Sequence, residues 1–112
     1  MEIQFYEKAI AFAKKYNVMI LHDNAYSDIV FGGKEGKSFL SYPGAMEVGI
    51  EFYSLSKSYN MTGMRISFAI GNKEIIEAFR KVRSQIDYGI FLPIQKAAVA
   101  ALKGPQDSVK EQ

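Results

Sequence analysis

The apolar residues in the N-terminal part of the chain recur at the spacing of a helix. Over residues 3–16 they stand three and four positions apart: Ile3, Tyr6, Ala9, Ile10 and Ala13. This pattern predicts an amphipathic helix that ends near Asn17. The unbroken apolar run 18–21 follows and stops abruptly at the polar residues 22–24. Such a run predicts a strand that is buried on both faces of a parallel sheet.

Two further apolar runs predict strands in the middle of the chain. They cover residues 50–55 and 65–70, and the short polar segment 56–64 separates them. Residues 31–44 mix several glycines and a proline with charged and aromatic side chains. That composition predicts a loop with little regular structure.

The C-terminal third of the chain carries two helix signals. Asn72 is a suitable N-cap for a helix that continues to about Gln85, and its apolar positions are Ile75, Phe79, Val82 and Ile86. A second apolar stripe follows Pro93 and stops at Gly104. We expect the tail from Gln106 onward to be frayed.

This order of helices and strands predicts an α/β fold with a mainly parallel sheet flanked by helices. At 112 residues and 48% hydrophobic content, the chain has the size of one ordinary domain. Three strands are nevertheless few for a sheet that buries both faces. The first predicted helix should also cross over from an earlier strand, so we expect residues 1–112 to be part of a larger domain.

Charge and composition exclude several classes of function. Fourteen Lys and Arg residues stand against twelve Asp and Glu residues, and no run of like charges offers a surface for a polyanion. We therefore expect no nucleic acid partner. The chain has no cysteine, which excludes disulfides and thiolate sites and is typical of a cytoplasmic protein. No apolar run is long enough to span a bilayer, so we expect no membrane partner.

Three local features have ordinary interpretations. The glycine-rich segment 32–38 resembles the end of a phosphate-binding loop, but the required first glycine is Phe31 and no helix pattern follows. His22 is the only histidine, which excludes a site of several histidines and favours a structural role. Tyr53 and Tyr59 stand near basic residues, as in single-strand nucleic acid sites, yet the surrounding sequence predicts a buried strand.

Polar residues with chemical potential stand at the ends of the predicted strands: Asp23, Tyr26, Ser54, Ser56, Lys57 and Arg65. Taken singly, each has an ordinary interpretation. An aspartate at a strand end often caps a turn, and a lysine in a polar loop is usually solvated. Their joint spacing carries more information than any one of them.

That spacing resembles the class I/II aminotransferases, which are fold-type I enzymes dependent on pyridoxal 5′-phosphate (PLP). The family pattern is Asp-x-x-Tyr, then Ser-x-x-Lys, with an arginine eight residues beyond the lysine. Asp23 and Tyr26 match its first part, and Ser54, Lys57 and Arg65 match the rest in the right order. The resemblance extends through nearly the whole chain, and no metal site is implied.

The resemblance implies a role for each matched residue toward the cofactor. Lys57 would carry PLP as a Schiff base and act as the catalytic acid and base. Asp23 would face the pyridine nitrogen and keep it protonated, and Tyr26 would donate a hydrogen bond to the phenolic oxygen of the ring. The phosphate would be held by Arg65 and by the Ser54 hydroxyl, with help from Ser56.

One residue departs from the family pattern. Ser67 stands where the family usually has glycine after Arg-x, and its larger side chain would crowd the pocket or its supporting strand. The residues with chemical roles are unchanged.

The resemblance also implies what surrounds this segment in the parent protein. Residues 1–112 would be the C-terminal portion of the PLP-binding large domain, without its N-terminal part and without the small domain. The full-length parent would transfer an amino group between an amino acid and a 2-oxo acid, as a homodimer in the cytoplasm. The fragment alone would be inactive and would associate through exposed sheet edges or apolar faces.

Two other functions remain open at this point. A PLP-dependent C–S lyase of the same fold would share the lysine and aspartate chemistry. A non-catalytic α/β interaction module descended from such an enzyme would retain only the fold. The region that binds the substrate carboxylate would discriminate a lyase from an aminotransferase.

Overall fold

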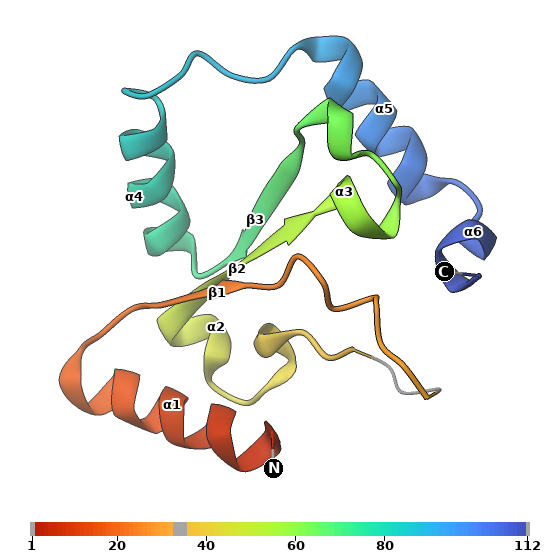
Figure 1. The fold of residues 1–112 in the computed structure, drawn as a ribbon. Helices are drawn as coiled ribbons and strands as arrows, with labels where there is room; N and C mark the ends of the chain where they lie inside the picture. The colour runs from red at the N-terminus through yellow and green to blue at the C-terminus, as the bar shows by residue number, and fades with distance from the viewer. Residues whose placement is uncertain (1, 33–35, 112) are drawn as a thin grey trace.

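The computed structural model describes residues 2–32 and 36–111 (Figure 1). Its elements in chain order are α1 (Glu2–Tyr16), β1 (Ile20–Asp23), the 3₁₀ turn η1 (Phe39–Ser41), α2 (Ala45–Val48), β2 (Gly49–Ser54), α3 (Leu55–Ser58), the 3₁₀ turn η2 (Thr62–Met64), β3 (Ser67–Gly71), α4 (Lys73–Arg83), α5 (Leu92–Lys103) and α6 (Asp107–Lys110). The middle of the glycine-rich segment, residues 33–35, lies outside the described residues.

The α/β fold is confirmed, and the described sheet is mixed, with strand order β1-β2-β3. β1 runs parallel to β2, whereas β3 runs antiparallel to it. The antiparallel pairing has a simple cause. A parallel crossover returns the chain to the opposite end of the sheet, usually through a full helix, whereas the connection between β2 and β3, residues 55–66, contains only the four-residue α3, the 3₁₀ turn η2 and short turns. The chain therefore re-enters the sheet at the end where β2 leaves it.

This topology brings three chain segments to one end of the sheet. Asp23 at the end of β1 pairs in register with Phe52, close to the end of β2. Ser54, the last residue of β2, pairs with Ser67, the first residue of β3. The carboxyl ends of β1 and β2 and the amino end of β3 consequently share one end of the sheet (Figure 1).

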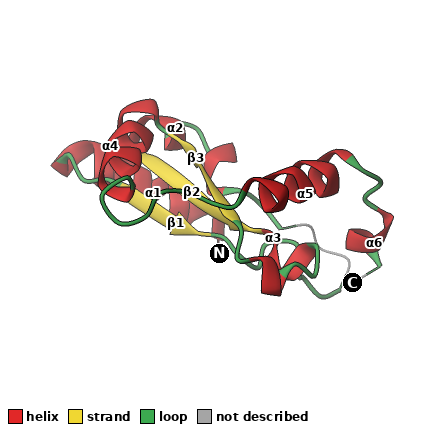
Figure 2. Ribbon diagram, turned by 90° about the horizontal axis from the view of Figure 1, so that it is seen from above, coloured by secondary structure: helices red, strands yellow, loops and turns green. Residues whose placement is uncertain are grey.

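Helices cover both faces of the sheet, as Figures 1 and 2 show. On one face, α1, η1 and α2 pack through a buried cluster of Ile10, Phe39 and Ala45. A second buried cluster, made by Leu55, Ile66 and Ala98, joins α3 and the start of β3 to α5. The α4 helix adds an edge-on ring contact between Phe79 and Phe52, with 5.3 Å between ring centroids.

Helix boundaries follow the local signals closely. The first helix ends at Tyr16, and Asn17 takes the left-handed conformation with φ of 53°, as a helix stop does. Asn72 caps α4 as predicted, because its Oδ1 accepts hydrogen bonds from the amides of Glu74 and Ile75 at 3.0 and 3.1 Å. The helix predicted after Pro93 is α5, and Gly104 follows its last residue.

The first strand departs from the prediction in position and burial. It covers Ile20–Asp23 rather than residues 18–21, because the Val18 amide still bonds the Ala13 carbonyl of the helix, at 3.0 Å. It is also not buried on both faces, since the Leu21 side chain is 61% exposed. An apolar run thus marked the strand without marking its limits.

The expected fraying of the tail is wrong. Residues Asp107–Lys110 form α6, and Gln106 anchors the turn before it. The Gln106 side-chain amide donates to the Gly104 carbonyl at 2.7 Å and accepts from the Tyr59 hydroxyl at 2.7 Å. These side-chain contacts hold the tail against the body of the chain, and no local sequence pattern predicts them.

The described part of the chain is flat and open. Its principal extents are 42 × 42 × 19 Å and its radius of gyration is 15.6 Å, against about 13 Å for a compact domain of this length. Large apolar side chains are exposed in several places, for example Phe5 on α1 and Ile86 and Phe91 in the connection between α4 and α5. Among the helices of the described residues, none is long and apolar enough to cross a membrane.

Candidate functional site

Asp23 and Tyr26 lie at the carboxyl end of β1. Asp23 is the last residue of the strand and is exposed. Tyr26 stands in the turn that follows, which is closed by a hydrogen bond from the Ile29 amide to the Tyr26 carbonyl at 3.0 Å. Side chains alternate between the faces of a strand, so Asp23 points to the opposite face from His22 and Asn24. Within the described residues its carboxylate makes no hydrogen bond or ion pair.

Ser54, Ser56 and Lys57 lie where β2 turns into α3. The Ser54 hydroxyl accepts a hydrogen bond from the Ser56 amide at 3.2 Å and so caps the short helix. Ser56 is buried, and its carbonyl accepts a hydrogen bond from the Thr62 hydroxyl at 2.8 Å. This cap and this tie explain why the chain turns sharply after β2 and presents Lys57 at the end of the sheet.

The structure brings Lys57 and Tyr26 together although they are far apart in the sequence. The Lys57 ammonium nitrogen, Nζ, lies 5.4 Å from the centre of the Tyr26 ring. This distance is within the range of an attractive cation–π contact. The lysine side chain is half-buried and the tyrosine is exposed. An amine and a phenol therefore stand side by side at the end of the sheet.

Arg65 lies at the same end of the sheet, between η2 and the start of β3. A backbone hydrogen bond from Leu55 to Ile66, at 3.4 Å, places Arg65 beside the start of α3. Its φ of 51° is in the left-handed region. Strained residues of this kind concentrate at functional sites. The guanidinium is exposed and donates to the Thr62 carbonyl at 3.2 Å, and the structure shows no contact between it and Ser54 or Lys57.

A groove of about 630 Å³ opens beside Arg65, between β3, α4 and α5. Its walls are mainly apolar and include Phe52, Phe79, Ala98 and Leu102. Arg65 is the only one of the six predicted site residues among the residues that line it. The groove is therefore separate from the contact between Lys57 and Tyr26.

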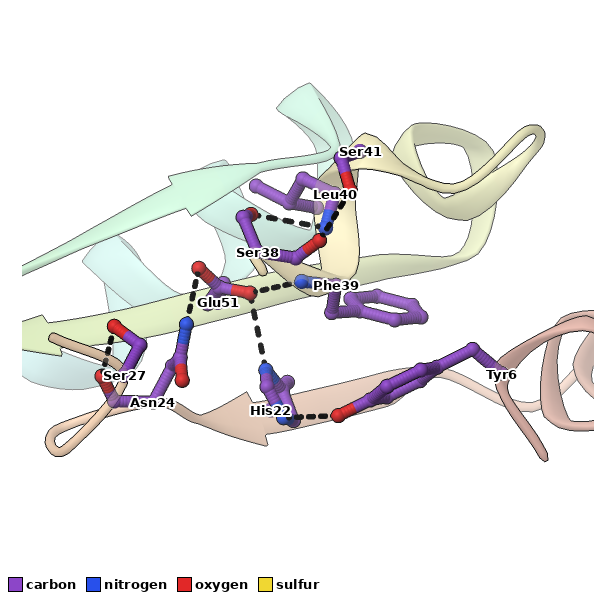
Figure 3. Close-up of polar contacts among 9 residues, drawn as sticks. All are labelled: Tyr6, His22, Asn24, Ser27, Ser38, Phe39, Leu40, Ser41 and Glu51. Atoms are coloured by element: carbon purple, nitrogen blue, oxygen red, sulfur yellow. Dashed lines mark hydrogen bonds and ion pairs between the residues drawn. The ribbon is translucent and has the colours of Figure 1, made fainter. Parts of the chain in front are cut away.

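A buried carboxylate that was not predicted from the sequence binds the segments on either side of it (Figure 3). Glu51 in β2 is 2% exposed, and its oxygens accept hydrogen bonds from the Phe39 amide at 2.7 Å and the Asn24 side chain at 3.0 Å. It also contacts His22 Nδ1 at 3.0 Å. Because an ionised carboxylate only accepts, His22 donates here. The hydrogen bond to Glu51 thereby fixes Asn24, the residue that directly follows Asp23.

His22 has the structural role that the sequence predicted. Its second nitrogen, Nε2, lies 3.1 Å from the Tyr6 hydroxyl of α1 (Figure 3). The ring therefore bridges α1 to Glu51 across the face of the sheet. The signal for Glu51 itself was present in the sequence, since it is a charged residue within an apolar strand run.

The environment of Glu51 favours its charged form. Burial raises the pKa of the Glu51 carboxyl, but the hydrogen bonds that it accepts outweigh burial, and the pKa lies below its ordinary value of 4.5. A group whose pKa is lowered by folding stabilises the folded state, and this contribution is complete at pH values above the pKa of the group in the unfolded chain. That contribution is lost as the pH falls from 4.5 through the folded value.

We therefore expect the Glu51→Gln variant to be less stable and less sensitive to acid. The loss should be about 1.5–3 kcal/mol near neutral pH, as for a hydrogen bond to a charged group. Below about pH 4.5 the wild type should lose stability by up to about 1.4 kcal/mol more per pH unit than the variant. Urea denaturation of the protein that contains this chain, across this pH range, measures both effects.

The matched control for this prediction is Glu77→Gln. Glu77 lies on α4, is exposed, and meets Lys73 only at 4.0 Å. Neutralising it should change the free energy of unfolding by less than about 0.5 kcal/mol. Equal acid sensitivity in the Glu51→Gln variant and the wild type would contradict the role given to Glu51.

Sequence comparison places the whole chain in one family. A family model described as aminotransferase class I and II matches residues 1–112. The chain is 49% identical over 111 residues to the glutamate–pyruvate aminotransferase AlaC of Escherichia coli, and it is 52% identical over 110 residues to an LL-diaminopimelate aminotransferase of Syntrophobacter fumaroxidans. These matches cover 99% and 98% of this chain, but only 27% and 28% of the relatives.

Solved structures agree with the sequence comparison. Substrate-bound BacF from Bacillus subtilis superposes with a TM-score of 0.89 at 42% identity, over 96% of this chain and 27% of that one. A probable N-succinyldiaminopimelate aminotransferase from Thermus thermophilus gives a TM-score of 0.89 at 38% identity, over 97% and 29%. The predicted fold-type I architecture is confirmed by this likeness. The chain belongs to the class I and II aminotransferase family.

Proposed function

We propose that the protein to which this chain belongs is a PLP-dependent aminotransferase that transfers an amino group between an amino acid and a 2-oxo acid. The contact between Lys57 Nζ and the Tyr26 ring carries this proposal. It brings together, from two separate strand ends, the amine and the phenol that the family pattern pairs. Asp23, Ser54 and Arg65 stand at the same end of the sheet.

The donor set at this end of the sheet fits PLP group by group. The cofactor offers an aldehyde, a basic ring nitrogen, a phenolic oxygen and a phosphate. Lys57 supplies an amine for the aldehyde, Asp23 a carboxylate for the ring nitrogen, and Tyr26 a hydroxyl for the phenolic oxygen. The phosphate matches a guanidinium and a hydroxyl, from Arg65 and Ser54. Bound PLP supplies the electron-accepting ring that stabilises charge at the substrate Cα.

Lys57 has two tasks in this proposal. Its amine would hold the cofactor covalently and, once the substrate amine has replaced it, would move the proton between the substrate Cα and the former aldehyde carbon of the cofactor. The Tyr26 ring beneath Nζ limits where a flexible lysine side chain can point. The Tyr26 hydroxyl donates a hydrogen bond toward the ring oxygen of the cofactor.

Asp23, Arg65 and the serines bind and orient. The Asp23 carboxylate, which has no partner among the described residues, holds a proton on the ring nitrogen. Arg65 donates to the phosphate through its fork of N–H groups, and Ser54 does so through its hydroxyl. Ser56 is buried, so it supports the turn of Lys57 more directly than it reaches a ligand.

The same proposal includes the place of this segment in a larger protein. We take residues 1–112 as the C-terminal portion of the PLP-binding large domain, in a protein that also has a small domain. The chain spans about 27% of the length of the curated relatives it matches. The open shape and the exposed apolar side chains of Phe5, Ile86 and Phe91 also support it, since large apolar side chains that are exposed in one segment are often covered by other protein surface.

Assembly and location belong to the proposal as well. We expect the full-length enzyme to be a homodimer in the cytoplasm. The lack of cysteine suits a reducing compartment.

The relatives named above are aminotransferases, which favours transamination over a C–S lyase and over a non-catalytic module. Formation of a new amino acid from a 2-oxo acid, without release of pyruvate from a sulfur amino acid, distinguishes the first two activities.

Covalent trapping tests the proposed function directly. The full-length protein is incubated with PLP, reduced with borohydride, digested and mapped by mass spectrometry. We expect the phosphopyridoxyl adduct on Lys57, because its amine is held at the end of the sheet beside Tyr26. The control omits borohydride and should yield unmodified peptide. An adduct on another lysine, or no adduct, would overturn the proposal.

A further inference from the structure

A partly buried hydrogen bond joins the turn that carries Tyr26 to the helix that carries Lys57. The Ser58 hydroxyl donates to Asp28 Oδ2 at 2.5 Å. Ser58 directly follows Lys57 and is 2% exposed, and Asp28 stands two residues after Tyr26 in the same turn. The two partners are thirty positions apart in the sequence. They form the direct polar link between the two segments whose side chains meet in the site.

A third residue determines the direction of this link. The Tyr53 hydroxyl lies 3.3 Å from the Ser58 hydroxyl oxygen. Because a serine has one proton to donate and Ser58 gives it to Asp28, Tyr53 donates to Ser58. The order Tyr53, Ser58, Asp28 thus runs from β2 through α3 to the Tyr26 turn. A short hydrogen bond to a carboxylate is among the stronger kinds in proteins.

Neither segment can hold its position alone. The α3 helix has four residues, which is too short to be stable without outside contacts. Ser54 caps its start, and Ser58 is its last residue. The Tyr26 turn is held at its beginning by the hydrogen bond from Asn24 to Glu51, at 3.0 Å. Asp28 lies at its other end, so the hydrogen bond between Ser58 and Asp28 ties this end of the turn to α3.

We propose that Asp28 and Ser58 are positioning residues for the reaction, which keep the Lys57 amine beside the Tyr26 phenol. This inference rests on the proposed function of Lys57. Neither residue touches the cofactor or the substrate in this account. They act by fixing the relative position of two segments, and displacement of a reacting group by about 1 Å can cost roughly a hundredfold in rate.

The test compares variants of the full-length enzyme in steady-state transamination. We expect Ser58→Ala and Asp28→Ala each to lower kcat by roughly tenfold to a hundredfold, with a much smaller change in KM. The double variant should lose little more than either single one, because both break one link. Asp28→Asn retains an oxygen that accepts the Ser58 proton, so it should keep most of the activity.

A second measurement separates positioning from general structural damage. The absorbance of the bound cofactor is followed as the pH of the PLP-loaded enzyme is varied. We expect the pH midpoint of the absorbance change to differ from that of the wild type in Ser58→Ala and Asp28→Ala, because Tyr26 is no longer held beside the Lys57 nitrogen that binds the cofactor. The control is Ser84→Ala, which removes a hydroxyl hydrogen bond to the Lys81 carbonyl at the end of α4, at 2.8 Å. It should leave both the midpoint and kcat unchanged.

The outcomes are distinguishable from failure of the proposed function. If borohydride labels no Lys57 in the wild type, the proposed function itself is wrong. If Lys57 is labelled and the alanine variants keep wild-type kcat and the wild-type midpoint, only the positioning role is overturned. Should Ser58→Ala fail to fold, Asp28→Ala and Asp28→Asn decide the question, because Asp28 is exposed.

Discussion

Alanine in place of Lys57 is expected to lower kcat of the full-length enzyme by at least roughly 10²–10⁴-fold. That range is the typical contribution of a positioned proton-transfer group, and the variant also loses the covalent link to the cofactor. The fold should survive, because among the described residues the ammonium group makes no hydrogen bond or ion pair and contacts the ring of Tyr26. Transamination between an amino acid and a 2-oxo acid, measured at saturating PLP, gives the rate.

Two further variants show whether the amine itself is responsible. Lys57→Arg keeps the positive charge, but a guanidinium cannot lose its proton in a protein, so the loss should match that of Lys57→Ala. Lys96→Ala removes an exposed lysine of α5 and should leave kcat unchanged. Wild-type activity in Lys57→Arg would mean that charge alone matters at this position, and the assigned chemistry would be wrong.

The Asp23→Asn variant is expected to lower kcat by roughly 10²–10³-fold, the typical cost of removing one preorganised electrostatic partner. A neutral amide of the same shape cannot hold a proton on the ring nitrogen of the cofactor. The free energy of unfolding should change little, because Asp23 is exposed and has no hydrogen bond or ion pair within the described residues. Steady-state rates and urea denaturation measure the two quantities.

A distant carboxylate provides the matched control for Asp23. Asp107→Asn neutralises an exposed aspartate at the start of α6 and should keep wild-type kcat. Borohydride labelling of Lys57 in the Asp23→Asn variant should persist, since the amine is untouched. A variant with normal kcat and normal labelling would contradict the role of Asp23 at the ring nitrogen.

Local signals predicted the long helices α1, α4 and α5 well, the first strand less well, and the short helices α2, α3 and α6 not at all. Asn72 defines the start of α4 because its side chain bonds amides only two and three residues away. The bounds of β1 depend instead on pairing with β2, and His22 and Asp23 are included because Glu51 and Phe52 lie opposite them. The antiparallel entry of β3 likewise depends on the connection that folds back over the end of the sheet.

For the candidate site, too, some features were predictable from the sequence and others depend on the folded structure. The spacing of Asp23, Tyr26 and Lys57 is a property of the chain and was visible as a family pattern. The partners that hold these residues were not visible, because Asp28 and Ser58 have no recognisable spacing and meet only in the folded chain. The sequence contained one usable signal of a buried partner, namely Glu51 within an apolar strand.

The sequence by itself determined the α/β class, the approximate limits of the long helices α1, α4 and α5, and the spacing of the residues to which we assign the chemistry, because capping, periodicity and motif spacing act over a few neighbouring positions. The tertiary structure alone decided that Lys57 lies 5.4 Å from the Tyr26 ring and that hydrogen bonds to the carboxylates of Glu51 and Asp28 hold the surrounding segments. The physical reason is that hydrogen bonds between distant segments depend on how strands pair and turns pack, and no local pattern encodes that arrangement.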